Sequence, residues 1–260
     1  MFVLNQLKAF LLLLVSVCLL VESVNAQAVY VFHICLDPPG DALSDGYKAD
    51  RDSLLSSFSS KAADSTFYND TLNNGVYGLF LCRGDVSNSA CRACVTAAGE
   101  DIRNRCSNNA SAVIWYDQCL LRYSNATFFG IPETARRVFM YNVGNNTTPD
   151  EPDAGALGII YTLVANAPYS ELMYGADDAT VMGGSQSRYG LVQCTRDISS
   201  DDCRRCLLKL TDDIPRCCQG KRGWRILAPS CYIRYEDYLF YEQPVLPPPP
   251  AAPPAPPTGD

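Results

Sequence analysis

The sequence predicts two similar domains in tandem, each built from both helices and strands and stapled by disulfides. The stretch VYGLFLCRGDVSNSACRACV of residues 76–95 returns as RYGLVQCTRDISSDDCRRCL of residues 188–207, with its cysteines at identical spacing. The offset between the copies is constant, from Tyr77 and Tyr189 to Phe128 and Phe240. A repeat unit of about a hundred residues indicates a duplicated domain, because solenoid units are shorter.

Residues 1–26 predict an export signal. Lys8 is the only charged side chain before an apolar run over residues 9–21, and Val24-Asn25-Ala26 fits a small-residue cleavage site. No segment after Ala26 is long and apolar enough to cross a membrane. We therefore expect a secreted, extracellular protein with no transmembrane segment in this chain.

The cysteines predict a disulfide framework. The chain has 13 cysteines, and cleavage after Ala26 would remove Cys18 and leave six in each repeat. An even set in an exported chain is typical of disulfides. Zinc is the alternative for the two C-x-x-C pairs, but His33 is the only histidine, and an oxidising compartment disfavours thiolate ligands. We expect no metal and no cofactor.

The first domain is expected to span residues 27–135. Apolar residues at helical spacing predict its helices, and runs of aromatic and β-branched residues predict its strands. Its elements are a strand over residues 28–35, a helix over 47–62, a strand over 77–82, a helix over 91–106 and a hairpin over 112–116 and 119–129. Cys91, Cys94 and Cys106 share one face of the second helix, so each must reach a different element.

The second domain is expected to span residues 136–242 and to repeat this order. Its strand over residues 138–142 is followed by helices over 157–164 and 203–218. Ser199 and Asp202 predict the N-terminal cap of the second helix. Residues 243–260 are rich in proline and predict an extended, disordered stalk without a core.

The sequence contains no catalytic constellation. It has no G-x-S-x-G, no phosphate-binding glycine loop and no H-E-x-x-H. His33 lies on an expected strand, and the carboxylate pairs of the second domain are adjacent residues whose side chains point apart. The formal net charge of -7 argues against nucleic acid as a partner. We therefore expect a binding protein and not an enzyme.

The cysteine pattern resembles that of a known family. Each copy has cysteines separated by eight and two residues, then by eleven and twelve, with Arg-Tyr shortly after the last. This pattern is similar to the ginkbilobin-type domain, also called the plant stress-antifungal domain. The tandem arrangement over residues 28–241 resembles the ectodomains of plant cysteine-rich receptor-like kinases and the cysteine-rich repeat secretory proteins.

The resemblance implies an α+β fold in which two helices pack on a five-stranded antiparallel sheet, twice. It also implies five disulfides, Cys35–Cys106, Cys82–Cys91, Cys94–Cys119, Cys194–Cys203 and Cys206–Cys231. Kinase-type members continue from a proline-rich stalk into a membrane helix and a kinase. The chain is therefore expected to be either a secreted paralogue or the outer half of a receptor, and only the latter would add a protein kinase beyond residue 260.

One disulfide of the second domain cannot match the first. Asn142 stands where Cys35 stands in the first copy, so Cys218 lacks that partner, and an extra cysteine, Cys217, lies beside it. Either Cys217 and Cys218 form a vicinal bridge, which could sense redox state, or both stay reduced. Because buried cysteines are usually inert, the sequence favours two reduced thiols.

The resemblance also suggests a sugar site. Ginkbilobin resembles a mannose lectin whose ligands are an asparagine, an arginine and a glutamate. In the first domain these positions hold Leu36, Val113 and Ser124, so no sugar site carries over. In the second domain they hold Val143, Arg225 and Glu236, with Asn142 one residue from the first position.

The sequence predicts how these residues are arranged. A two-residue loop at Pro229-Ser230 would place Arg225 opposite Arg234, with Glu236 as its diagonal neighbour on the same face. A guanidinium and a carboxylate so placed could hold vicinal sugar hydroxyls through charge-assisted hydrogen bonds. The alternative is that they neutralise each other as an ion pair. The candidate carbohydrate ligands are therefore Asn142, Arg225 and Glu236.

Two surface patterns indicate where a partner would bind. N-glycosylation sequons occur at Asn69, Asn109, Asn125, Asn145 and Asn146. The second domain concentrates basic residues, which are Arg204, Arg205, Lys209, Arg216, Lys221, Arg222 and Arg225. This basic, sequon-free surface could contact acidic cell-wall polysaccharide, an anionic headgroup or another receptor ectodomain, or it is a solvated helix face.

These patterns lead to one main hypothesis and one alternative. The main hypothesis is an extracellular, non-catalytic recognition module of the apoplast that serves plant stress or defence signalling and binds a carbohydrate or a protein partner. The alternative is a secreted antifungal lectin that acts directly through mannose.

Overall fold

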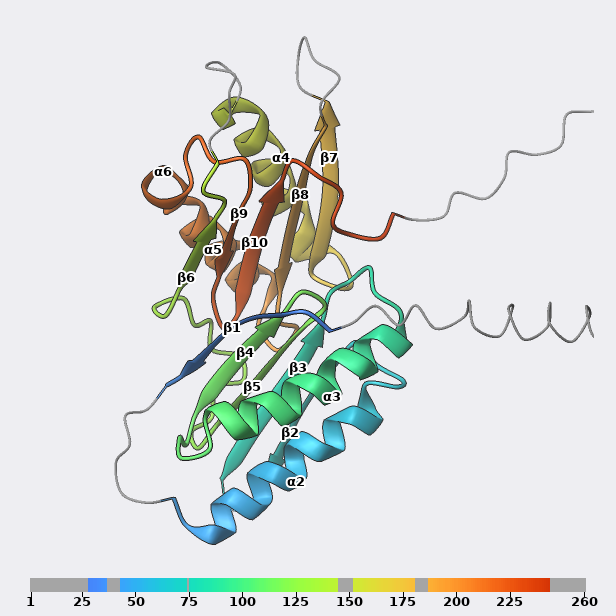
Figure 1. The fold of residues 1–260 in the computed structure, drawn as a ribbon, viewed down its shortest axis with the longest axis vertical. Helices are drawn as coiled ribbons and strands as arrows, with labels where there is room; N and C mark the ends of the chain where they lie inside the picture. Colours follow the sequence, from blue (N-terminus) through green and yellow to red (C-terminus); the bar gives the residue numbers. More distant parts are fainter. Residues whose placement is uncertain (1–27, 37–42, 74, 145–151, 181–186, 244–260) are drawn as a thin grey trace, which may run out of the picture.

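Each half of the chain forms a five-stranded antiparallel sheet with helices on one face (Figure 1). The computed structural model describes residues 28–36, 43–73, 75–144, 152–180 and 187–243. The predicted export signal, nearly all of the predicted stalk, and Asn145 and Asn146 lie outside these residues. No helix among the described residues combines the length and apolarity needed to span a bilayer.

The first domain contains the sheet order β1-β4-β5-β3-β2, with α2 and α3 packed on one face. Its elements are β1 (Tyr30–Cys35), α2 (Asp45–Lys61), β2 (Phe67–Leu72), β3 (Val76–Cys82), α3 (Asn88–Arg105), β4 (Ala112–Tyr116) and β5 (Cys119–Ser124). Phe58, Phe80 and Tyr123 are fully buried between the helices and the sheet. The two helices and the five strands confirm the expected fold.

The second domain repeats this arrangement with the sheet order β6-β9-β10-β8-β7. Its elements are β6 (Val138–Tyr141), α4 (Pro152–Asn166), η1 (Ala167–Tyr169), β7 (Tyr174–Thr180), β8 (Ser187–Cys194), α5 (Ser200–Thr211), α6 (Ile214–Cys217), β9 (Trp224–Leu227) and β10 (Cys231–Glu236). The Ser199 hydroxyl accepts a hydrogen bond from the Asp202 backbone N–H at 3.1 Å, as the capping motif predicts.

The second helix of this domain is shorter than predicted. The expected helix over residues 203–218 ends as α5 at Thr211, and a single turn, α6, follows. Pro215 explains the break, because a proline has no N–H to donate to the preceding turn and its ring clashes with it. The corresponding helix of the first domain, α3, has no proline and runs unbroken to Arg105.

The structure has six disulfides among the described residues. They join Cys35–Cys106, Cys82–Cys91, Cys94–Cys119, Cys194–Cys203, Cys206–Cys231 and Cys217–Cys218. The first five are the pairs that the resemblance implies. The sixth, Cys217–Cys218, differs from the sequence-based preference for two reduced thiols. All other described cysteines are paired with one another, so Cys217 is the partner that remains for Cys218.

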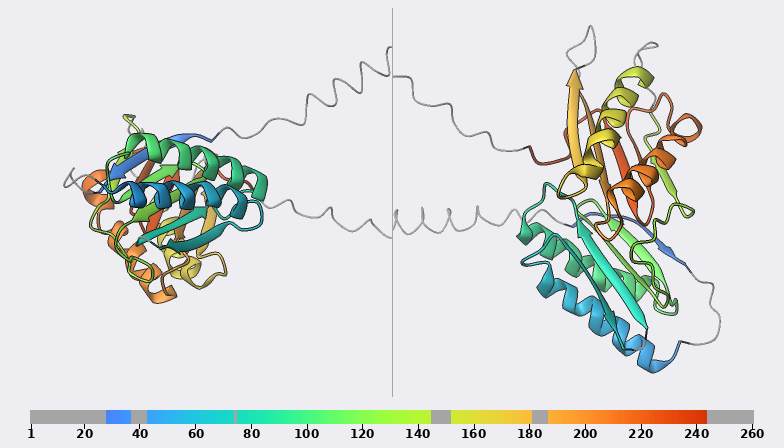
Figure 2. Two further views of the ribbon diagram at one scale, coloured as in Figure 1. Left: turned by 90° about the horizontal axis from the view of Figure 1, so that it is seen from below. Right: turned by 180° about the vertical axis from the view of Figure 1, so that it is seen from behind.

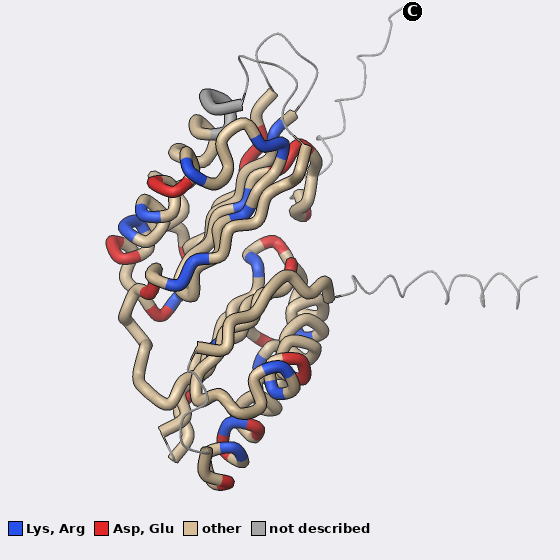
Figure 3. The backbone as a smooth tube through the Cα atoms, turned by 60° about the vertical axis from the view of Figure 1, so that its left-hand side comes forward, with Lys and Arg blue, Asp and Glu red and all other residues tan. Residues whose placement is uncertain are grey.

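The two sheets pack against each other through the faces that the helices leave open (Figures 2 and 3). Leu79, Val113 and Trp115 of the first sheet and Leu227 of the second belong to one buried apolar cluster. The helices consequently lie on the outer sides of the molecule. Burial of this cluster is the main stabilising contribution to the contact between domains, since it removes apolar surface from water.

Close polar contacts also cross the interface. The Gln193 side-chain amide donates to the Cys82 carbonyl at 3.1 Å, and Arg196 donates to the Thr66 hydroxyl at 2.8 Å. A Cβ built on Gly84 would lie 2.4 Å from the Tyr174 ring. The loop after β3 therefore meets the start of β7 at a distance that only glycine permits.

We expect Gly84→Ala to destabilise the contact between the domains. The added methyl group cannot fit beside Tyr174, and overpacking of this kind costs about 1–3 kcal/mol. Thermal unfolding should show a midpoint lowered by several degrees. The control is Gly158→Ala in α4, where an added Cβ meets nothing within 4 Å and helix propensity favours alanine. Equal midpoints for both variants would contradict the close contact.

We also expect the vicinal disulfide to be present in the folded protein. Trypsin cleaves after Arg216 and Lys221, which releases a peptide that contains both Cys217 and Cys218. Without reductant, this peptide should be lighter than the dithiol form by the mass of two hydrogens and should resist alkylation. A doubly alkylated peptide recovered without reductant would show two reduced thiols instead.

Candidate binding pocket between the domains

A pocket of about 280 Å³ opens where β1 of the first domain meets β6, β9 and β10 of the second. Residues of both domains line it, namely Val29, Tyr30, Val31, Asp117, Met140, Tyr141, Asn142, Gly223, Trp224, Arg225, Glu236 and Tyr238. Ligand sites of globular proteins start at about 300 Å³. The pocket therefore has room for a small polar ligand or for the end of a longer one.

Strand register brings the predicted sugar ligands together in this pocket. Arg225 of β9 pairs with Arg234 of β10, as the two-residue loop predicts. Arg225 Nε lies 3.6 Å from Glu236 Oε1, which confirms the diagonal arrangement. Glu236 Oε1 also accepts a hydrogen bond from Arg234 Nε at 3.0 Å. Arg225 and Glu236 thus interact with each other and still line the pocket.

The third candidate residue, Asn142, packs against Gly223. A Cβ built on Gly223 would lie 1.9 Å from Glu236 Oε2 and 2.8 Å from Asn142 Nδ2. The side chains of Asn142 and Glu236 therefore occupy the space above this glycine. The Asn142 backbone N–H donates to the Gly223 carbonyl at 2.9 Å, which fixes the end of β6. Val143, which holds the asparagine position of the resemblance, is 96% exposed and does not line the pocket.

Asp117 is a pocket residue that the sequence did not indicate. It lies in the turn between β4 and β5 of the first domain, and its carboxylate forms an ion pair with Arg225 Nη1 of the second. The same carboxylate lies 3.8 Å from Arg234 Nη1. No local sequence signal relates this aspartate to the second domain, because the contact depends on how the two sheets pack.

Burial affects the ionisation of Glu236. The residue is only 4% exposed, and desolvation raises the pKa of its carboxyl above the ordinary value, although Arg234 and Arg225 act in the opposite direction. Arg225 keeps its Nη2 group without a partner among the residues that the structure describes. The pocket therefore retains a hydrogen-bond donor beside a carboxylate, which is the pair that a diol requires.

The basic surface of the second domain is largely neutralised. Five of its predicted members form ion pairs with a nearby carboxylate, and these pairs are Arg205–Asp202, Lys209–Asp212, Arg216–Asp213, Arg222–Asp237 and Arg225–Asp117. Figure 3 shows acidic and basic residues side by side along the helices of this domain. This arrangement favours a solvated helix face over a strongly attractive site for an acidic polysaccharide.

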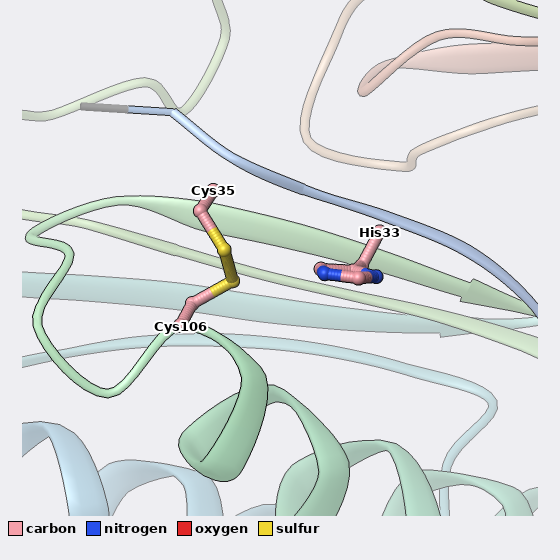
Figure 4. Close-up of side chains that lie close together, drawn as sticks. All are labelled: His33, Cys35 and Cys106. Carbon is pink, nitrogen blue, oxygen red and sulfur yellow. A yellow bond between two sulfur atoms is a disulfide. The ribbon is translucent and has the colours of Figure 1, made fainter. Parts of the chain in front are cut away.

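A second cluster, around His33, differs from a metal site in its chemistry (Figure 4). His33, Cys35 and Cys106 place their ligand atoms within 4.8 Å of one another. The two sulfur atoms are bonded to each other, so they offer no thiolate. His33 Nδ1 is hydrogen-bonded to the Tyr30 hydroxyl at 2.7 Å, and burial together with Arg105 lowers the pKa of the imidazole.

The sequons that the structure describes all lie in the first domain. Asn125 is exposed just after β5, whereas Asn69 of β2 and Asn109 are half-buried. Their modification stays a prediction. None of these three residues lines the pocket between the domains, so a glycan attached there would not start inside it.

Fold and cysteine framework together define a class of tandem, disulfide-stapled ectodomains, and the comparisons identify the family. The family model described as salt stress response/antifungal matches residues 34–126 and 156–238. These two regions cover most of both domains. The chain belongs to this family, which confirms the resemblance seen in its cysteine pattern.

Relatives with similar sequences include an antimicrobial protein, a secretory protein and a receptor-like protein kinase. An antimicrobial ginkbilobin-2-like protein of Castanea crenata is 35% identical over 235 residues, which cover 88% of this chain and 97% of the relative. Cysteine-rich repeat secretory protein 38 of Arabidopsis thaliana is 35% identical over 85% of this chain and 89% of the relative. Cysteine-rich receptor-like protein kinase 25 of the same plant is 35% identical over 92% of this chain but only 37% of its own length.

Solved structures support the fold. The tandem DUF26 ectodomain of the Arabidopsis thaliana cysteine-rich receptor-like protein PDLP8 superposes with a TM-score of 0.66 at 22% identity and covers 80% of this chain and 98% of that one. The corresponding ectodomain of PDLP5 gives a TM-score of 0.65 at 26% identity with the same coverage. The tandem organisation of two α+β domains is therefore shared with these receptor-like proteins.

We expect the stability contribution of Glu236 to decrease as pH rises. Because its pKa is raised in the folded state, the folded protein binds the proton more tightly than the unfolded chain does. The contribution is therefore complete below the ordinary glutamate pKa and is lost as pH rises through the folded-state value. Urea unfolding of the wild type and of Glu236→Gln across this range should show the wild type losing stability relative to the variant. The opposite slope would mean that the two arginines outweigh burial.

Proposed function

We propose that the protein is a non-catalytic, extracellular recognition module whose pocket between the domains binds a mannose-type glycan. The observation that carries this proposal is the convergence of Asn142, Arg225 and Glu236 in one pocket. These residues come from the end of β6, from β9 and from β10. Arg225 and Glu236 hold two of the ligand positions that the resemblance to a mannose lectin implies, and Asn142 is one residue from the third.

The chemistry of the pocket suits an uncharged polyol. Asn142 offers both a donor and an acceptor, Arg225 offers the unused Nη2 donor, and Glu236 offers acceptors. Adjacent hydroxyls of a sugar ring can accept from a guanidinium and donate to a carboxylate at the same time. The Tyr238 hydroxyl accepts a hydrogen bond from Arg234 at 3.1 Å. This residue lines one side of the pocket with an aromatic ring and a polar hydroxyl.

The family membership supports an extracellular role in stress or defence. The family description refers to salt stress and antifungal responses, and the relatives carry the names antimicrobial, secretory and receptor-like. The two carboxylates that line the pocket, Asp117 and Glu236, are both in contact with arginines. We infer that the protein acts in the apoplast by binding, without transforming its ligand.

A protein partner is the second candidate. Exposed apolar side chains gather along the outer strands β1 and β6, with Phe32 at 38%, Phe139 at 41% and Tyr141 at 53% exposure. Both strands are at the edge of their sheets and offer unpaired backbone groups to a binding partner. A receptor ectodomain could dock here, beside the pocket or in place of a glycan.

Substitution of the pocket residues tests glycan binding. We expect Asn142→Ala to weaken binding of a mannose oligosaccharide about fivefold, which corresponds to one lost hydrogen bond of about 1 kcal/mol. Asn142 is exposed, and its backbone N–H bond to the Gly223 carbonyl does not depend on the side chain, so the fold should tolerate the change. Glu236→Gln should weaken binding about tenfold or more, because it removes a charged acceptor. Isothermal titration calorimetry measures both effects.

The matched control is Arg204→Ala. Arg204 is exposed on α5 and lies outside the pocket, so its loss should leave sugar affinity unchanged. A glycan array completes the test. If the wild-type protein binds no glycan on it, the glycan proposal is wrong and the protein partner becomes the better candidate. If Arg204→Ala weakens binding as much as Asn142→Ala, the ligand binds at the basic surface instead.

A further inference from the structure

Asp117 is held rigidly where the first domain borders the pocket. Its backbone N–H donates to the Val29 carbonyl at 2.9 Å, and its backbone carbonyl accepts from Arg83 Nη1 at 3.1 Å. Arg83 is itself fixed by a buried ion pair with Asp85 at 2.6 Å. Residues of the first domain alone therefore hold the backbone of Asp117 in place, and its carboxylate faces the second domain.

The charges of the two arginines that contact Glu236 are balanced only when Asp117 is counted. The second domain contributes two guanidinium groups, Arg225 and Arg234, and one carboxylate, Glu236, which contact one another. Asp117 supplies the second carboxylate and contacts both arginines. Two other cations lie nearby: Arg222 is paired with Asp237, and Lys221 lies over the uncharged Tyr141 ring and keeps its charge.

We propose that Asp117 is a specificity-determining residue that makes the pocket select uncharged glycans over glycans that contain uronic acids. This inference rests on the proposed glycan-binding function and extends it to the class of sugar. A ligand carboxylate that approached Arg225 would have to compete with Asp117 and would be repelled by it. A neutral sugar uses the Nη2 donor of Arg225 and meets no such repulsion. Selectivity then arises from rejection of the wrong ligand as well as from contacts to the right one.

The arrangement also explains why the site needs both domains. Without the first domain, the arginine pair would be in excess over Glu236, and the site would attract anionic sugars. Plant cell walls contain both neutral and uronic-acid polysaccharides, so a secreted receptor of either class needs such discrimination. The first domain has Leu36, Val113 and Ser124 at the corresponding positions and, on this proposal, sets the specificity of the other copy.

The test compares two probes on the full secreted chain. Calorimetry measures the affinity of a mannose oligosaccharide and of an oligogalacturonate of the same length, for the wild type and for Asp117→Asn, which removes the charge with little change of shape. We expect the wild type to prefer the neutral sugar. We expect the ratio of the two affinities to shift toward the uronate by about tenfold or more in the variant, because an arginine becomes available to a carboxylate.

Two further variants make the result specific. Asp117→Glu keeps the charge and should keep the preference for the neutral sugar. Asp212→Asn removes an equal charge from an exposed position that pairs with Lys209, so it controls for the change in net charge and should leave the ratio unchanged. Thermal midpoints of all variants show whether the domains remain folded.

The outcomes separate this inference from the proposed function. If the wild type binds the neutral sugar and Asp117→Asn shows the same affinity ratio, Asp117 does not set specificity, while the glycan-binding function stands. If the wild type binds neither sugar, the proposed function itself is wrong. If the wild type already prefers the uronate, the charge balance of the pocket does not govern selection and the inference is overturned.

Discussion

The buried apolar contact between the two sheets, in which Leu79, Val113 and Trp115 lie in one cluster with Leu227, is the constraint on which the rest of the structure depends. Two apolar sheet faces can pack against each other in many ways, but two guanidinium groups at their edge need a compensating carboxylate when they are partly buried. Asp117 supplies it from the opposite domain. This ion pair acts together with the other polar contacts that cross the interface, and the pocket opens where β1 meets β6.

The two copies of the domain have diverged in complementary ways. Val113 occupies in the first copy the position that Arg225 holds in the second, and it is fully buried in the contact between the sheets. Arg122, the counterpart of Arg234, lies 4.0 Å from the Phe128 ring, and burial lowers its pKa to about 10. At the position of Val113 and Arg225, the first copy has a valine packed between the sheets and the second has an arginine that lines the pocket. Loss of the long bridge at Asn142 in the second copy also places an amide where a cysteine would stand.

The sequence predicted the repeated core because its cysteines and apolar residues report local periodicity. It did not indicate β2 and β7 from residue patterns, since FYNDTL and YGADDAT contain asparagine, aspartate and glycine and are strands only because β3 and β8 pair with them. The family resemblance pointed to Arg225 and Glu236, and their closeness was predictable because a short hairpin sets their register. Asp117 and the close fit of Gly84 to Tyr174 were not, because they follow from contacts between domains that no local pattern encodes.

Hydrogen–deuterium exchange in the presence of a mannose oligosaccharide tests the central claim that the ligand site is shared by both domains. The account predicts slower exchange in the segment around Val29–Val31 of the first domain and, at the same time, around Met140–Asn142 and Gly223–Arg225 of the second. Protection of the second domain alone, or protection confined to α5, would contradict a site built from both halves of the chain.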